Sequence, residues 1–180
     1  MSILKVARMG HPVLRKRARA LERADLKSAV VQRLIDDLID TMDEYHGIGL
    51  AAPQVHESVR VFIAGMQEEA EGDDDEPGII PVPFINPEII PIGAEKETDW
   101  EGCLSIPDVR GKVPRYSRVK IRGLDREGTR QELQLTGFPA RVVQHENDHL
   151  DGVLFVDRLP AIARRLLLRR LRQRRRKEGW

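Results

Sequence analysis

The sequence predicts one α+β domain over residues 1–180, with small antiparallel or mixed β-sheets packed around a central helix. Three observations predict this class. Several short strand-like segments come before an internal helix instead of alternating with helices. A strongly periodic helix lies in the N-terminal part, and an arginine-rich helix closes the chain. A length of 180 residues, with 41% apolar and 33% charged residues, suits one globular domain with a sizeable core.

The first long helix is predicted from about Leu26 to Tyr45. The basic segment 10–24 before it indicates an arm or a loop. Asp25 is a suitable N-cap for this helix, and Gly47 is a suitable stop. Apolar side chains recur every four residues, as expected for one buried helix face: Leu26, Val30, Leu34, Leu38 and Met42.

Strands are predicted in the middle of the chain. Val59, Val61 and Ile63 occupy alternate positions, as in a half-buried strand. Residues 67–83 contain seven acidic residues and three prolines, which predicts a mobile acidic loop. We expect the remaining short strands around residues 84–90, 118–124 and 131–135.

Two further helices are predicted after the strands. Gly137 and Pro139 mark the start of a helix that extends to Gly152. The final helix runs from about Pro160 to Lys177, within a basic C-terminal tail of residues 161–180. Its packed side is expected to carry Ile162, Leu166, Leu167 and Leu171.

The charge of the chain is unevenly distributed. Residues 161–177 contain nine basic residues and no acidic residue. Because the whole chain carries a net charge of +1, the remainder carries −8. An acidic body with a basic tail predicts an anionic partner for that tail.

The most specific pattern in the chain is His145-Glu146-Asn147-Asp148-His149. Positions i and i+4 lie on one face of a helix, so both imidazoles can bind one metal ion, and Glu146 can reach a water molecule there. With 5 His and 29 acidic residues among 180, chance predicts about 0.02 occurrences of such a pattern. The central helix is therefore predicted to bind a metal through His145 and His149, as in metal-dependent hydrolases.

A catalytic metal usually has three protein ligands and one open position. No third His follows at the spacing that one class of zinc proteases uses, and Glu178 is the only Glu after the motif. Asp151 and Asp157 remain alternatives. Upstream, Cys103 is the only thiol of the chain, and residues 101–107 around it predict an irregular, exposed turn. A Cys/His/His set with an open position suits Zn²⁺ or Fe²⁺.

Residues 47–54 read Gly-Ile-Gly-Leu-Ala-Ala-Pro-Gln. Small residues allow another backbone to approach closely, as for a bound peptide, and Gln54 offers an amide donor. A helix stop followed by a turn would explain Gly47 and Pro53. It would not explain the second glycine, Gly49, or the glutamine, Gln54.

These three segments resemble the peptide deformylase family. That family carries G-x-G-L-A-A-x-Q, E-G-C-L-S and Q-H-E-x-D-H in this order, which stand here as Gly47–Gln54, Glu101–Ser105 and Gln144–His149. The resemblance covers about residues 3–160. It implies a metal-dependent hydrolase that removes the N-formyl group from the N-terminal methionine of newly synthesised proteins and releases formate. It also implies one divalent ion, Fe²⁺, with Zn²⁺, Ni²⁺ or Co²⁺ as alternatives.

The resemblance implies roles for single residues as well. The expected metal ligands are Cys103, His145 and His149. Glu146 would move the protons of the reaction. The backbone N–H of Leu104 and the side chain of Gln54 would stabilise the oxyanion.

The substrate is expected to pair with the backbone of Gly49, much as an added strand does. Arg110 is a candidate for binding the peptide, and Glu101 is a candidate for orienting a metal ligand. The candidates for an apolar methionine pocket are Ile48, Phe138 and Val142.

Two other functions remain open. The first is an endopeptidase that uses the same two histidines with an Asp as third ligand, although it leaves the segments 47–54 and 101–105 unexplained. The second is a ribosome- or RNA-binding module that docks on ribosomal RNA through Arg164–Lys177.

The composition also limits where the chain can work. A single cysteine excludes an internal disulfide and fits a reducing cytoplasm. No apolar run approaches the roughly 20 residues that a membrane span needs, and the first residues lack a signal-peptide core. We expect a cytoplasmic monomer, because no long exposed apolar seam is apparent.

Overall fold

The computed structural model describes residues 2–67 and 78–178, with side-chain surroundings up to residue 173. The strands are β1 (Gly49–Ala51), β2 (Val61–Gln67), β3 (Ile79–Pro91), β4 (Lys96–Cys103), β5 (Ile106–Tyr116), β6 (Arg118–Leu124) and β7 (Arg130–Thr136). The helices are α1 (Arg23–Leu26), α2 (Ala29–Glu44), α3 (Gly137–Leu150) and α4 (Ala161–Glu178), with 3-10 turns η1 (Pro12–Arg15), η2 (Ala52–Val55) and η3 (Phe155–Asp157).

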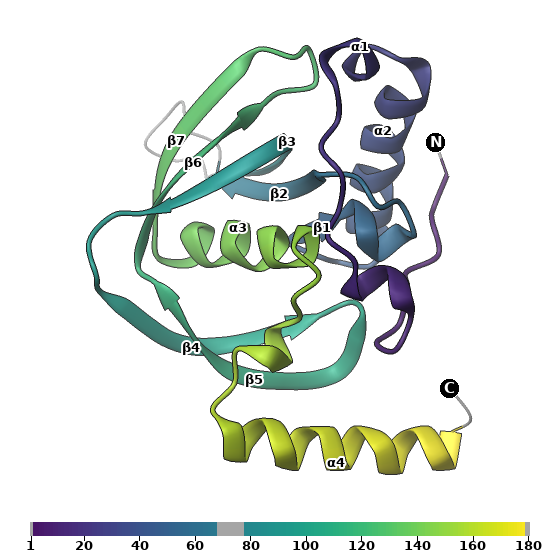
Figure 1. The fold of residues 1–180 in the computed structure, drawn as a ribbon, viewed down its shortest axis with the longest axis vertical. Coiled ribbons are helices and arrows are strands. Elements are labelled where there is room, and N and C mark those ends of the chain that lie inside the picture. The colour runs from purple at the N-terminus through teal and green to yellow at the C-terminus, as the bar shows by residue number, and fades with distance from the viewer. Residues whose placement is uncertain (1, 68–77, 179–180) are drawn as a thin grey trace.

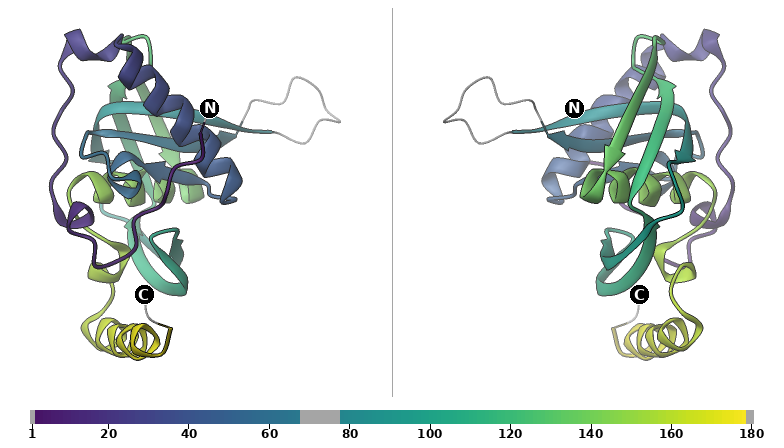
Figure 2. Two further views of the ribbon diagram at one scale, coloured as in Figure 1. Left: turned by 90° about the vertical axis from the view of Figure 1, so that its right-hand side faces the viewer. Right: turned by 90° about the vertical axis from the view of Figure 1, so that its left-hand side faces the viewer.

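The strands form two antiparallel sheets (Figure 1). The larger sheet has the order β1-β2-β3-β6-β7, and β4 pairs with β5 in a separate hairpin. The helix α3 lies between the larger sheet and this hairpin, and α4 lies beyond the hairpin at one end of the molecule (Figures 1 and 2). The predicted α+β class with small antiparallel sheets is therefore confirmed.

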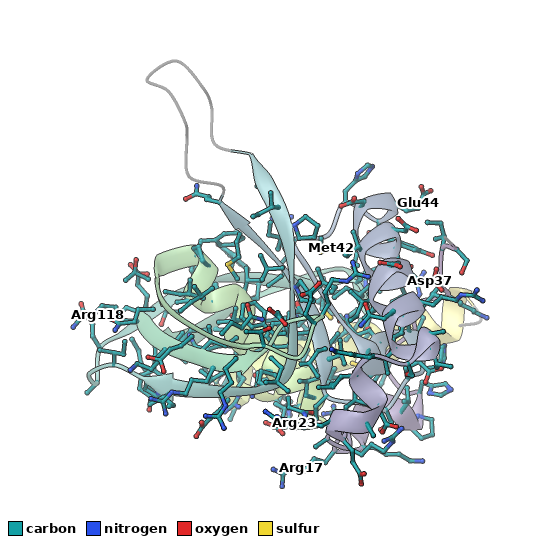
Figure 3. The ribbon with its side chains drawn as sticks, turned by 90° about the horizontal axis from the view of Figure 1, so that it is seen from above. Arg17, Arg23, Asp37, Met42, Glu44 and Arg118 are labelled. Carbon is teal, nitrogen blue, oxygen red and sulfur yellow. The ribbon has the colours of Figure 1, made fainter. Side chains whose placement is uncertain are left out.

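The helix α2 begins later than predicted. Ser28, not Asp25, is its N-cap, because the Ser28 hydroxyl accepts a hydrogen bond from the Val31 N–H while Asp25 belongs to the short α1. The predicted face also needs one correction, since Val30 is 78% exposed whereas Val31, Leu38 and Met42 are buried. Figure 3 shows Met42 on α2, at the opposite side of the molecule from Arg118.

The strand β2 is buried on both faces, so the predicted half-buried strand is wrong. Val61 and Ile63 belong to the apolar cluster that includes α2. Phe62 and Ala64 belong to the cluster that includes α3. Because α2 and α3 both contact β2, a helix covers each face of the strand. This double cover fixes α3, and with it the histidine motif, against the middle of the sheet.

The acidic loop predicted over residues 67–83 does not include residue 67 or residues 79–83, which belong to strands. Residues 68–77 lie outside the described part of the chain, but residues 79–83 belong to β3. Pro81 and Pro83 are tolerated there because both have their nitrogen on the same side of the strand, away from β2. The strand β6 pairs with β3 only from Ile85 onwards, so no neighbouring strand requires their missing N–H groups.

The β4–β5 hairpin was not predicted as strands. Residues 96–103 show no alternation of apolar and polar side chains, since residues 96–99 are polar and exposed and the buried position 101 is a glutamate. Pairing with β5 holds the segment extended. Leu104 and Ser105 form the two-residue connection between Cys103 and Ile106. The predicted irregular turn over residues 101–107 is therefore a two-residue turn, preceded by a shift of the strand register between Glu101 and Cys103.

The helix α4 packs differently from the prediction. Leu171 is buried and Leu167 is partly buried, in an apolar cluster with the β5 residue Val113. Ile162 and Leu166 are instead 78% and 56% exposed. Within the described chain, no helix is both long enough and apolar enough to cross a membrane.

Candidate metal centre

The histidine motif lies on the buried face of α3. One turn of helix separates His145 from His149, and both rings turn towards Cys103, at the end of β4. The Cys103 Sγ lies 3.3 Å from His149 Nε2. One candidate ligand atom from each of Cys103, His145 and His149 lies within 4.8 Å of the other two. The structure therefore brings the thiol and both imidazoles to one point.

The alternative third ligands point elsewhere. Asp151 forms an ion pair with Arg60 at 2.7 Å, at the C-terminal end of α3. Asp157 pairs with Arg15 and with Arg164. Neither carboxylate belongs to the cluster of ligand atoms, so the geometry favours Cys103.

The donor set fits a divalent ion that accepts sulfur and nitrogen. Burial lowers the pKa of His149 well below its usual value, which keeps this imidazole neutral and able to act as a ligand. Burial also lowers the pKa of His145, but hydrogen bonds with Cys103 and Glu101 outweigh that effect and raise it. The proton that this arrangement retains on His145 would leave when an ion binds.

The second nitrogen of His145 is held by a buried carboxylate. Glu101 Oε2 lies 2.9 Å from His145 Nδ1. Arg115 makes two hydrogen bonds to the same carboxylate, of 2.8 and 2.9 Å, and Arg141 makes one of 2.8 Å. Burial raises the pKa of Glu101, but the hydrogen bonds from Arg115 and His145 outweigh it and lower the pKa to about 2. Glu101 is therefore a buried anion in contact with the Nδ1 atom of His145.

Glu146 is buried beside the candidate ligands. Its Oε2 atom has no hydrogen-bond partner among the described residues, which is costly for a carboxylate unless another group engages it. Burial is the main cause that raises the pKa of Glu146 to about 7. A carboxylate with this pKa can accept and return a proton near neutral pH.

Gly49 makes room for that carboxylate. A Cβ atom at position 49 would lie 2.5 Å from Glu146 Oε1, closer than real Cβ atoms come to other atoms. A side chain at position 49 would thus collide with the Glu146 carboxylate, a constraint on this glycine that the sequence did not reveal.

Gln54 is held in place by its own backbone turn. Its Oε1 accepts a hydrogen bond of 2.8 Å from the Ala51 N–H. Its Nε2 donates to Ser105 Oγ at 3.3 Å and lies 3.5 Å from Cys103 Sγ. The amide donor therefore faces the connection between β4 and β5, which contains Leu104.

All the site residues that the sequence predicted, except His149, line one cleft of about 1040 Å³. The predicted residues in its wall are Ile48, Gly49, Gln54, Glu101, Cys103, Leu104, Arg110, Phe138, Val142, His145 and Glu146. His149 is almost completely buried and contacts Cys103 directly. The lining also includes Lys5, Arg8, Tyr45 and Trp100, which belong to no recognisable local motif.

Arg115 and Asp148 are buried charged residues beside the site that the sequence did not single out. Arg115 lies on β5, in a strand that was not predicted, and bridges Glu101 and Asp148. Asp148 stands inside the histidine motif, where its position between two metal-ligand candidates could have drawn attention to it.

A His-Glu-x-x-His helix beside a thiol, in the wall of one cleft, defines a metal-dependent hydrolase. A family model described as polypeptide deformylase matches residues 3–165. The chain belongs to the peptide deformylase family. Membership makes it a hydrolase that removes the formyl group from an N-terminal methionine, which confirms the function that the three motifs implied. The endopeptidase and the RNA-binding module are not favoured as its main function.

Individual relatives and structures agree with this membership. "Peptide deformylase 1" of Prochlorococcus marinus is 46% identical over 159 residues, which cover 88% of this chain and 82% of the relative. The peptide deformylase of Salinibacter ruber is 43% identical over 95% of this chain and 88% of its own length. A Met-Ala-Ser-bound class I type b peptide deformylase from Acinetobacter baumannii has a TM-score of 0.79 and 40% identity, covering 88% of this chain and 99% of that one. A peptide deformylase from Legionella pneumophila has a TM-score of 0.81 and 34% identity, over 99% of this chain and 98% of that one.

Proposed function

We propose that Cys103, His145 and His149 hold one divalent metal ion and that the cleft around them deformylates N-formylmethionyl nascent peptides. The observation that carries this proposal is the convergence of three ligand atoms within 4.8 Å, next to a buried carboxylate with an unpartnered oxygen. When bound, the ion supplies Lewis acidity for a carbonyl oxygen and for water. We propose Fe²⁺ as the native ion, although the ligands suit Zn²⁺, Ni²⁺ and Co²⁺ as well.

Glu146 is the proton carrier in this proposal. Its pKa of about 7 lets it take a proton from the attacking water and return it to the amine that leaves. Because the buried carboxylate lies in the wall of the same cleft as Cys103 and His145, the proton moves over a short distance.

The oxyanion that forms from the formyl carbonyl needs donors that are already in position. The Nε2 group of Gln54 is one such donor, since the hydrogen bond from Ala51 to its Oε1 fixes the orientation of the amide. The backbone N–H of Leu104 is the second donor, at the connection that follows Cys103. Losing one donor of this kind typically costs about 10²–10³ in rate.

The cleft binds the peptide along its backbone and the methionine in an apolar recess. Gly49, at the start of the edge strand β1, pairs with the substrate chain as an added strand would. The recess is formed by Ile48, Val142 and Phe138, the last of which is 57% exposed at the cleft wall. Arg110 binds the peptide further along the cleft.

One preparation tests the metal and the reaction together. The protein is purified without oxygen, its metal content is measured, and formate release from formyl-Met-Ala is assayed. We expect about one divalent ion per chain and an activity that falls in air if the ion is Fe²⁺. Cys103→Ala should lose the ion. Normal metal content and activity in that variant would overturn the ligand assignment.

The basic helix α4 is proposed as a docking element for ribosomal RNA near emerging chains. Exposed arginines on it include Arg165, Arg169, Arg170 and Arg172. Several phosphate contacts make binding steeply dependent on salt. We further propose that the protein acts as a monomer in the cytoplasm, where such chains emerge.

Charge reversal tests this docking without removing the buried Leu171. Arg165→Glu combined with Arg169→Glu should abolish co-sedimentation with ribosomes at low salt. Arg23→Glu, which changes an exposed basic residue outside α4, should not. Unchanged co-sedimentation of the double variant would overturn the docking role.

A further inference from the structure

A chain of ion pairs runs from the surface to the ligand candidate His145. Arg158, which follows η3, is 48% exposed at its side chain. It donates two hydrogen bonds to the buried Asp148, of 2.6 Å to Oδ1 and 3.1 Å to Oδ2. Asp148 Oδ2 also accepts a hydrogen bond of 2.5 Å from Arg115. Arg115 in turn holds Glu101, which contacts His145 Nδ1.

Arg115 is shared between two carboxylates that compete for it. Its Nε and Nη2 atoms bind Glu101, and its Nη1 atom binds Asp148. Both carboxylates are buried, so each needs nearby positive charge to remain ionised at low cost. Arg158 supplies a second cation to Asp148, and Arg141 supplies a second cation to Glu101.

Removing the surface cation would unbalance this arrangement. Asp148 Oδ1 would lose the only partner that the described residues give it, and Asp148 would attract Arg115 more strongly. Any shift of Arg115 towards Asp148 weakens the paired contact that fixes Glu101. The ring of His145 would then be held less firmly, because groups behind a ligand orient that ligand.

We propose that Arg158 is a positioning residue for metal binding: it keeps Arg115 on Glu101 and so holds His145 in the orientation that a ligand needs. The proposal rests on the proposed ligand set of Cys103, His145 and His149. It gives a role in the centre to a residue outside the helix α3 and outside the three sequence motifs.

The test compares Arg158→Met with Arg122→Met. Arg122 is a suitable control because it is 50% exposed and forms a surface ion pair with Glu132 on β7, in the larger sheet. Co²⁺ affinity is measured by competition with a chelating dye, and the visible absorption of the Co²⁺-loaded protein reports the ligand geometry. The urea unfolding of each metal-free protein is measured in parallel.

We expect Arg158→Met to weaken Co²⁺ binding by about tenfold and to alter the Co²⁺ spectrum, as is typical for groups behind a ligand. Arg158→Lys should recover part of the affinity, because an ammonium can still reach one oxygen of Asp148. Arg122→Met should leave affinity and spectrum unchanged. The positioning role would be overturned if the metal-free Arg158→Met protein were destabilised enough to explain its weaker Co²⁺ binding and its Co²⁺ spectrum were unchanged.

The Co²⁺ spectrum of the wild-type protein tests the ligand assignment separately from the role of Arg158. A Co²⁺ spectrum without the absorption of a thiolate ligand would overturn the assignment of Cys103. If that absorption is present and Arg158→Met matches the wild type in both affinity and spectrum, the ligand set stands and the role of Arg158 falls.

Discussion

At the residue scale, the site leaves no room for a side chain at position 49, beside the Glu146 carboxylate that we propose as the base. Because a Cβ atom at position 49 would lie 2.5 Å from Glu146 Oε1, Gly49→Ala must displace that carboxylate. We expect formate release to fall by up to about 10²-fold, since small misplacements of a reacting group are costly. Metal content should remain at the wild-type level, because position 49 touches the base and not the ligand candidates. A variant with wild-type turnover would show that the carboxylate relaxes without penalty.

Glu146 itself allows the most direct residue-scale prediction. Glu146→Gln keeps the shape of the side chain but removes its ability to accept a proton. Formate release should fall by about 10²–10⁴-fold, the usual contribution of a positioned acid or base. Metal analysis of the same sample is the control and should give an unchanged stoichiometry. Turnover close to the wild-type rate would assign the proton transfers to another group.

At the element scale, α4 offers a pair of leucines that differ in burial. Leu171→Ala removes a buried side chain from the contact with the hairpin and should lower the free energy of unfolding by about 2 kcal/mol. Leu166→Ala changes a side chain that is 56% exposed and should shift it by less than about 0.5 kcal/mol. Urea unfolding measures both, and hydrogen exchange over residues 161–173 should speed up only in the first variant. Equal effects would mean that α4 does not dock through Leu171.

The elements predicted most accurately were those with strong local signals. The strand at residues 118–124 and the helix that begins at Gly137 match the structure closely, because alternation and turn residues mark them. The β4–β5 hairpin could not be foreseen, since its strands are stabilised by pairing with each other and by the apolar cluster behind them. Arg115 could not be predicted as part of the site for the same reason, because its partners Glu101 and Asp148 lie on β4 and α3, far from it in the sequence.

At the scale of the whole molecule, the buried ion pairs link stability to pH. The pKa of Glu101 is about 2 in the folded state and about 4.5 when unperturbed, so its ionised form stabilises the fold above about pH 4.5. This contribution is lost as the pH falls from about 4.5 to about 2. Its size is on the order of 3 kcal/mol, since one pKa unit corresponds to about 1.4 kcal/mol.

The comparison with Glu101→Gln isolates that contribution. Metal-free wild type and variant are unfolded with urea at several pH values, so that loss of metal in acid does not interfere. The wild type should be clearly more stable at neutral pH, and the difference should shrink as the pH falls through the window between 4.5 and 2. A difference that stays constant across this window would rule out a lowered pKa for Glu101.

Taken over the whole chain, the sequence predicted the chemistry of the site better than its surroundings. The two histidines and the proposed base could be recognised because residue type and helical spacing constrain them tightly. Cys103 was found instead as the only thiol of the chain and through the family resemblance of its segment. The network behind them depends on which buried charges meet in three dimensions, and no spacing in the sequence encodes that. The prediction of which α4 side chains are packed was wrong in part for the same reason, since Leu171 is buried by contacts with residues far away in the chain.

The separation of Cys103 on β4 from His145 on α3 also has a topological consequence. An ion bound to both residues would close a loop of chain between positions 103 and 145, as a disulfide does. Such a closure removes conformations from the unfolded chain, with an entropic stabilisation of about 4 kcal/mol. The ion would then be a reversible cross-link, so that a cell short of the metal would hold a protein that is both inactive and less stable.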